Sequence, residues 1–156
     1  ISGGTTYRFS SSAQSNSITI YYAPYSNSTI LTEDEKTNFI ETKGAYYITD
    51  KITIERGSQY TAIFNLDVEI YQNSSIDSEV GDILDNYSNK FNIKFPELTE
   101  EIKSLISKIS NVKRIIDMEI TYTNEDGSVV SPEIVYGEGN VVYFSINYII
   151  NSVIES

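Results

Sequence analysis

One stretch of strict alternation, residues 60–71, limits the folds that this chain can adopt. Its apolar side chains all share one parity: Ala62, Phe64, Leu66, Val68 and Ile70. Only Ile63 is apolar on the other parity. A period of two over this length is typical of a long strand with one buried face. A slip of one residue would bury Asp67 and Glu69, so the register of this strand is strongly specified.

A second alternating segment, residues 116–122, predicts a partner for the first strand. Its apolar parity holds Ile116, Met118, Ile120 and Tyr122. Two amphipathic helices are predicted between the two strands, over residues 76–91 and 99–110. Pro96 is expected to separate the helices, with Thr99 as the N-cap of the second. The helices should therefore cover the apolar face that both strands share.

The segments before residue 60 predict two more strands and one more helix. Residues 18–22 (ITIYY) are β-branched and aromatic, which favours a strand. Thr32 and Glu35 have the spacing of a capping box, and a helix is expected over 32–43. Residues 51–55 predict a short strand, and a turn at residues 56–58 is expected to lead into the long strand.

The segments after residue 123 predict a hairpin and a last strand. Residues 124–127 (NEDG) have the composition of a hairpin turn. Residues 129–136 are expected to form the returning strand, with Pro132 at an edge or a bulge. Residues 140–150 are the most apolar run in the chain and predict the last strand.

Together these segments predict an α+β fold with a mixed or antiparallel sheet and two or three amphipathic helices packed on it. The expected order is strand-helix-strand-strand-helix-helix-strand, followed by a C-terminal hairpin. We expect residues 1–17 to be a linker or arm, 18–123 to be the α+β domain and 124–156 to be an extension. The sequence begins with Ile1 rather than Met, which favours a fragment or a processed product.

Composition argues against most kinds of chemistry. The chain has no Cys and no His, which removes thiolate nucleophiles, the commonest general base and the commonest metal ligand. The net charge of −11 opposes binding to nucleic acid or to anionic membranes. The carboxylates of residues 67, 69, 117 and 119 are expected to be solvated strand positions, and turn 124–127 lacks the spacing of a calcium loop. We therefore expect no catalytic, cofactor or metal site.

Residues 141–150 are apolar on both faces of the predicted strand, which requires cover on two sides. We expect Val141, Tyr143, Phe144 and Ile149 to lie at an interface with another subunit. The alternative is that helix 32–43 covers the second face within the domain.

The same segments resemble a known family. They read ITIYYAP, LTEDEKTNFI, DKITIERGSQYTAIFNLDVEIY, SEVGDILDNYSNKF and LTEEIKSLISKISNVKRIIDMEITY. This pattern of element lengths and apolar positions resembles the C-terminal half of the baseplate J-like family, the baseplate wedge proteins of contractile-tailed bacteriophages. The resemblance covers residues 18–123. Asn111 stands where the family often has Gly, and Gly57-Ser58 where it often has Pro.

The resemblance implies a structural subunit rather than an enzyme. Such proteins join into wedges that close a ring around the tail hub and rearrange when the sheath contracts. The implied partners are other baseplate and tail subunits in a homo- or hetero-oligomer, assembled in the host cytoplasm and located in the virion. The alternative is an acidic, β-rich binding module that recognises a sugar or a protein on a cell surface.

Overall fold

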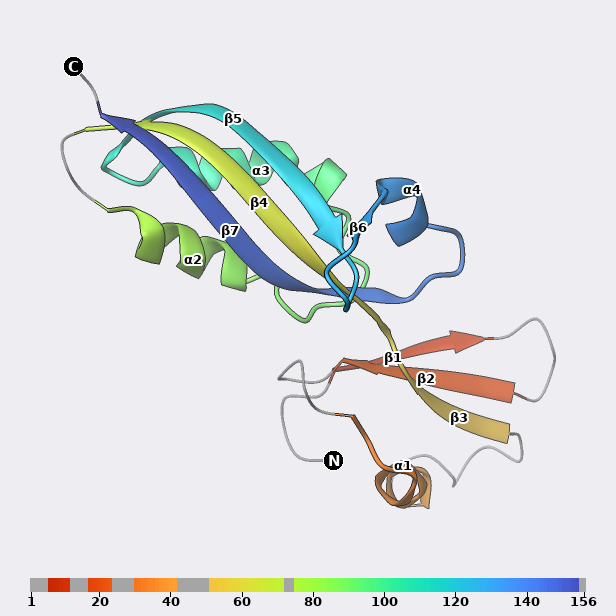
Figure 1. Cartoon of the computed structure of the whole chain (residues 1–156). Coiled ribbons are helices and arrows are strands. Elements are labelled where there is room, and N and C mark those ends of the chain that lie inside the picture. Colours follow the sequence, from red (N-terminus) through yellow and green to blue (C-terminus); the bar gives the residue numbers. More distant parts are fainter. Residues whose placement is uncertain (1–5, 12–16, 24–29, 42–50, 72–74, 155–156) are drawn as a thin grey trace.

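The fold is α+β, as predicted, with two sheets joined through one continuous stretch of chain (Figure 1). The computed structural model describes residues 6–11, 17–23, 30–41, 51–71 and 75–154. The elements are β1 (Thr6–Ser11), β2 (Ser17–Ala23), α1 (Glu33–Phe39), β3 (Lys51–Arg56), β4 (Ser58–Ile70), α2 (Asp77–Asp85), α3 (Phe95–Ser107), β5 (Val112–Thr123), β6 (Val129–Val130), α4 (Pro132–Val135) and β7 (Val142–Ile154). Strand β1 occupies part of the predicted arm.

The first sheet has the order β1-β2-β3, with β2 antiparallel to β1 and parallel to β3. Helix α1 packs on this sheet through Phe39, next to the buried Ile20 and Ile54. The predicted capping box opens the helix. The Thr32 hydroxyl accepts from the Glu35 amide at 3.2 Å, and the Glu35 carboxylate accepts from the Thr32 amide at 2.8 Å.

The second sheet has the order β6-β5-β4-β7, with β4 antiparallel to β5 and parallel to β7. Helices α2 and α3 lie on one face of it (Figure 1). The returning strand predicted over 129–136 is wrong beyond Val130, because Pro132 opens the short helix α4 instead of an edge or bulge. The fixed φ of proline suits the first turn of a helix, where no backbone donor is needed.

The alternation of β4 is confirmed. All five apolar residues of its predicted parity are at most 4% exposed: Ala62, Phe64, Leu66, Val68 and Ile70. In β5 the prediction fails at Ile116, which is 50% exposed. The register shifts after Asp67 pairs with Asp117, so Val68 faces Ile115 and Ile116 becomes the extra residue of a bulge. A bulge reverses the parity of the residues beyond it.

Helix α2 is shorter than predicted, whereas α3 is shifted toward the N-terminus of its predicted range. Helix α3 begins at Phe95 and takes Pro96 into its first turn, so Thr99 lies inside the helix rather than at its cap. The Thr99 hydroxyl donates to the Phe95 carbonyl at 3.0 Å. The Phe95 ring is fully buried and meets Phe64 and Phe144 edge-on, with centroids 5.2 and 5.0 Å away. The start of α3 therefore anchors the aromatic core.

The division between the two sheets falls at Gly57. Strand β7 pairs with β4 along the whole of its thirteen residues, so β6 and β7 both belong to the second sheet. Strands β2 and β3 belong to the other sheet. The expected domain over 18–123 thus spans parts of both sheets.

Gly57 is the single residue between β3 and β4, and it is not the predicted turn. Its amide donates to the Tyr22 carbonyl in β2 at 2.9 Å, while the next amide, of Ser58, donates to the Val141 carbonyl at 2.8 Å. A Cβ on Gly57 would lie 2.7 Å from the Phe91 ring, which is closer than van der Waals contact allows. A side chain at this crossing would therefore require the Phe91 ring to move, which favours glycine.

Truncation of the helix core tests how α2 and α3 are packed. Leu84 and Ile106 are each 1% exposed, and we expect Leu84→Ala or Ile106→Ala to lower the free energy of unfolding by about 2–5 kcal/mol. Urea denaturation measures the change. Leu105→Ala is the control, because Leu105 is 36% exposed and should cost less. Equal losses at all three positions would contradict this packing.

Candidate functional site

Three of the four residues expected at an interface are buried within the chain itself. Val141, Tyr143 and Phe144 are 8%, 0% and 0% exposed, so the fold of this chain already covers their side chains. The aromatic core covers Phe144 from the helix side, and Phe91 covers Tyr143 from the loop after α2, with ring centroids 5.8 Å apart. Only Ile149, at 52%, is exposed.

The alternative source of cover, helix 32–43, is not used in the described part of the chain. Its residues Phe39 and Ile40 pack against Ile52 and Ile54 of the first sheet. The second layer over the start of β7 is instead the loop that contains Phe91, together with the junction at Gly57. This cover ends near Phe144.

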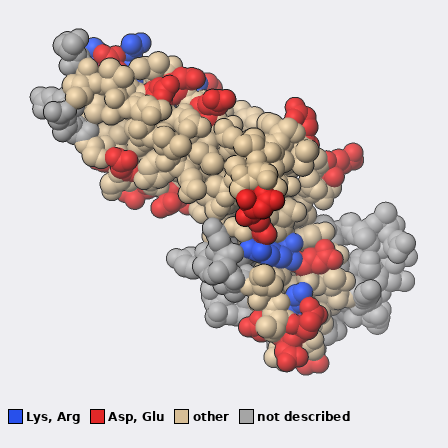
Figure 2. Space-filling view, viewed as in Figure 1, with Lys and Arg blue, Asp and Glu red and all other residues tan. Residues whose placement is uncertain are grey.

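The face of the second sheet that lies opposite α2 and α3 carries short polar side chains that bond across the strands. The Thr61 and Ser145 hydroxyls are 2.9 Å apart, and the Asn151 amide donates to the Asp67 carboxylate at 2.9 Å. Large apolar side chains stand exposed among them: Ile116 (50%), Ile149 (52%) and Val153 (58%). On the face drawn in Figure 2, an uncharged band runs along the second sheet between scattered acidic groups.

The outer edge of β7 is closed only at its start. The Asn92 amide donates to the Val142 carbonyl at 2.7 Å, its side-chain oxygen accepts from the Val142 amide at 3.0 Å, and the Asn89 amide donates to the Phe144 carbonyl at 2.9 Å. Both asparagines have positive φ, 57° at Asn89 and 54° at Asn92, a conformation that asparagine tolerates better than most residues. Beyond Phe144 no described strand pairs with this edge.

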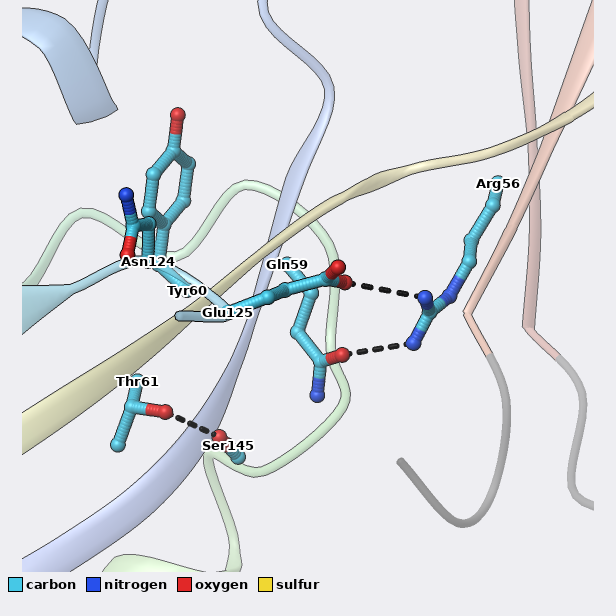
Figure 3. Close-up of a pocket in the computed structure, with 7 residues that line it drawn as sticks. All are labelled: Arg56, Gln59, Tyr60, Thr61, Asn124, Glu125 and Ser145. Carbon is cyan, nitrogen blue, oxygen red and sulfur yellow. Dashed lines mark hydrogen bonds and ion pairs between the residues drawn. The ribbon is translucent and has the colours of Figure 1, made fainter. Parts of the chain in front are cut away.

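A polar pocket of about 300 Å³ lies where the two sheets meet (Figure 3). Its lining comes from β3, β4, β7 and the turn after β5: Arg56, Gln59, Tyr60, Thr61, Asn124, Glu125 and Ser145. The Arg56 guanidinium donates to Glu125 at 3.0 Å and to Gln59 at 2.7 Å. Because Glu125 neutralises this cation, the pocket suits a neutral ligand with many hydroxyl groups better than an anion.

Tyr143 lies beside this arginine, and its environment changes its acidity. Burial raises the pKa of the Tyr143 phenol to about 12, against the opposing effect of the nearby Arg56 cation. Glu125 adds a smaller effect that also raises it. The phenol therefore stays neutral at any physiological pH.

Most of the acidic positions singled out in the sequence have structural partners. Glu69 accepts from Arg114 at 2.6 Å, and this bond holds the pKa of the Glu69 carboxyl below its usual value. In the turn 124–127, the Asn124 side chain accepts from the Ser128 amide at 3.0 Å, and bonds from Ser128 lower the pKa of Asp126. Among the residues described here, no cluster of three or more acidic side chains is placed to hold a metal ion.

No family model matches the chain, and no curated protein matches it either. None of the helices in the described part is long and apolar enough to cross a membrane.

Two features of this region were not predicted from the sequence. The first is the loop of Asn89 and Asn92, for which two asparagines three residues apart in a polar segment were the available signal. The second is Arg56, whose partners Gln59 and Glu125 lie 3 and 69 residues further along the chain. Periodicity carries no signal for a contact that a turn makes with a strand so distant in sequence.

The raised pKa of Tyr143 predicts a loss of stability at high pH. An unfolded tyrosine ionises near pH 10, whereas the folded one resists ionisation until about pH 12, so stability should fall as pH rises from about 10 to 12. Tyr143→Phe should weaken this fall, measured as Tm across that range. The control is Tyr71→Phe at a tyrosine that is 43% exposed. Identical profiles for the two variants would contradict the assignment.

Proposed function

We propose that the chain is a structural subunit of a bacteriophage contractile-tail baseplate, a wedge protein that assembles with neighbouring subunits into a ring around the tail hub. The single observation that carries the proposal is the uncovered side of the second sheet, where Ile116, Ile149 and Val153 are each at least half exposed. The resemblance of residues 18–123 to the baseplate J-like family supplies the particular assembly. On this proposal the chain acts in the virion and assembles in the host cytoplasm.

Leaving this apolar surface in water has a free-energy cost that assembly would remove. A side chain such as Ile149 gains about 1.5–3 kcal/mol when a partner buries it. Single exposed isoleucines are ordinary on monomers, but here they adjoin an edge strand that presents unpaired backbone groups among the described residues. A sheet with one face covered by helices and the other open suits a protein that completes its second layer with a neighbour.

The proposed surface can be tested at Ile149. We expect Ile149→Asp to weaken association with a neighbouring tail subunit by about tenfold or more, because a buried isoleucine is replaced by a charge. Sedimentation of the chain alone and mixed with candidate tail subunits measures the association.

Ile134→Asp is the matched control, since Ile134 is 59% exposed on α4, away from the open face of the sheet. The control should leave association unchanged, and both variants should keep the Tm of the parent chain. Equal binding by the Ile149 variant would show that this face is not an assembly surface.

The junction pocket favours a second candidate, a binding module for a cell-surface sugar. Tyr60 offers a ring for stacking, and Gln59 and Asn124 offer amides that hydrogen-bond hydroxyl groups. A panel of oligosaccharides titrated into the chain would distinguish the two candidates. Saturable binding that is lost in Tyr60→Ala, with a monomeric chain throughout, would support the sugar module and count against the wedge protein.

A further inference from the structure

The start of the β7 edge shows which backbone groups of this strand point outward. The loop after α2 bonds to the amide and carbonyl of Val142 and to the carbonyl of Phe144. The register with β4 is regular along the whole of β7, so the same orientation repeats at every second residue. The amides and carbonyls of Ile146, Tyr148, Ile150, Ser152 and Ile154 therefore point to the outer edge.

The contact at Phe91 also shows how a strand fits this edge. Phe91 forms an antiparallel bridge with Tyr143, so the loop already makes one step of an antiparallel ladder. The rest of the edge lacks the features that usually prevent pairing with another chain. From Val142 to Ile154 the strand has no charged residue, no proline and no register shift. A further strand can continue along this edge where the loop stops.

The flank of α2 determines which side chains such a strand should carry. Tyr148 packs against Gly81 on this flank, and its hydroxyl donates to the Asp77 carbonyl at 3.0 Å. Asp77 and Asp85 lie one turn before and after Gly81, so both exposed carboxylates line the helix side of the edge. The other side of the edge presents the exposed Ile149 and Val153. A strand bound at this edge should therefore carry basic side chains on the side of Asp77 and Asp85 and apolar side chains on the side of Ile149 and Val153.

The same charges disfavour a second copy of the chain as the occupant. Pairing of β7 with β7 of another copy would bring two α2 helices together. Each carries four acidic residues and no basic one: Asp77, Glu79, Asp82 and Asp85. Two chains of net charge −11 would also repel each other over longer distances.

We infer that the edge from Ile146 to Ile154 binds, by antiparallel strand addition, an extended segment of another protein in which Lys or Arg alternates with β-branched or apolar residues. The backbone of that segment supplies the affinity through the ladder, and the alternating side chains supply the specificity. This inference rests on the proposed function and names the kind of partner that such an assembly subunit would hold.

An alternating Lys-Val peptide long enough to span Ile146 to Ile154 is the probe. Ser152→Pro removes one outward donor at an exposed edge position, where proline is compatible with a strand and the ladder to β4 is left intact. We expect it to weaken peptide binding by about tenfold, measured by fluorescence anisotropy, while Ser152→Ala binds as the parent chain does.

Peptide controls keep the inference testable even if the proline variant does not fold. An alternating Lys-Pro peptide has the same charge but cannot form the ladder, and an alternating Glu-Val peptide can form it but carries the wrong charge. Both should bind at least about tenfold more weakly than the Lys-Val peptide to the parent chain. Equal binding of the Lys-Pro peptide would mean non-specific attraction to an acidic protein and would overturn the inference.

Two further outcomes separate this inference from the proposed function. If Ile149→Asp weakens association with a tail subunit but Ser152→Pro leaves both that association and peptide binding unchanged, assembly stands and strand addition is wrong. If the chain alone forms a dimer that Ser152→Pro dissociates, the occupant is a second copy and the basic partner is wrong.

Discussion

Two consecutive backbone hydrogen bonds, one to each sheet, hold the crossing of the chain at Gly57, and much of the rest of the structure depends on them. In an extended chain successive amides point to opposite sides, so Gly57 bonds to β2 while Ser58 bonds to the residue before β7. The strand that ends the first sheet can thus begin the second without a turn. This geometry brings Phe91, Tyr143 and the Val141 carbonyl so close to Gly57 that a side chain there would push its neighbours aside.

The crossing at Gly57 also explains why the Tyr143 phenol and the Arg56 guanidinium are shielded from solvent. Tyr143 is fully buried because the crossing lies on one side of it and the loop after α2 on the other. Arg56 is held beside it with only 19% of its side chain exposed, and the charge is balanced by Glu125 from the turn after β5. A partly buried cation without such a partner would be costly. The turn after β5 therefore helps to stabilise the junction, although its composition indicates only a hairpin.

The sequence correctly predicted the structural features that arise from local patterns of residues. The alternation from Ala62 to Ile70 determines which face of β4 is buried, and the capping box at Thr32 determines where α1 begins. Predictions failed where tertiary pairing altered the period. The bulge at Ile116 arises from the register between β4 and β5. Pro96 lies inside α3 because this helix begins at Phe95, whose side chain is buried in the core.

The sequence indicated that the last strand needs cover on both faces, but it did not indicate which parts of the chain provide that cover. The apolar run from Val141 to Ile150 indicated cover on both faces, yet its first half is covered by the chain's own loop and junction. That loop approaches β7 because Asn89 and Asn92 adopt positive φ, a choice of conformation that composition does not specify. What remains open is the second half of the strand, where Ile149 is exposed on one face and the edge is unpaired within the described residues.

The parallel pairing of β4 with β7 has a mechanical consequence. The start of β4 is tied to the first sheet at Gly57, whereas the far end of β7 lies at Ile154, beside the end of β4. A pull between the first sheet and that far end would draw the two strands in opposite directions along their length. The hydrogen bonds of the ladder would then resist together in shear instead of parting one after another. A neighbour bound near Ile154 could thus transmit tension to the rest of the molecule without unzipping the sheet.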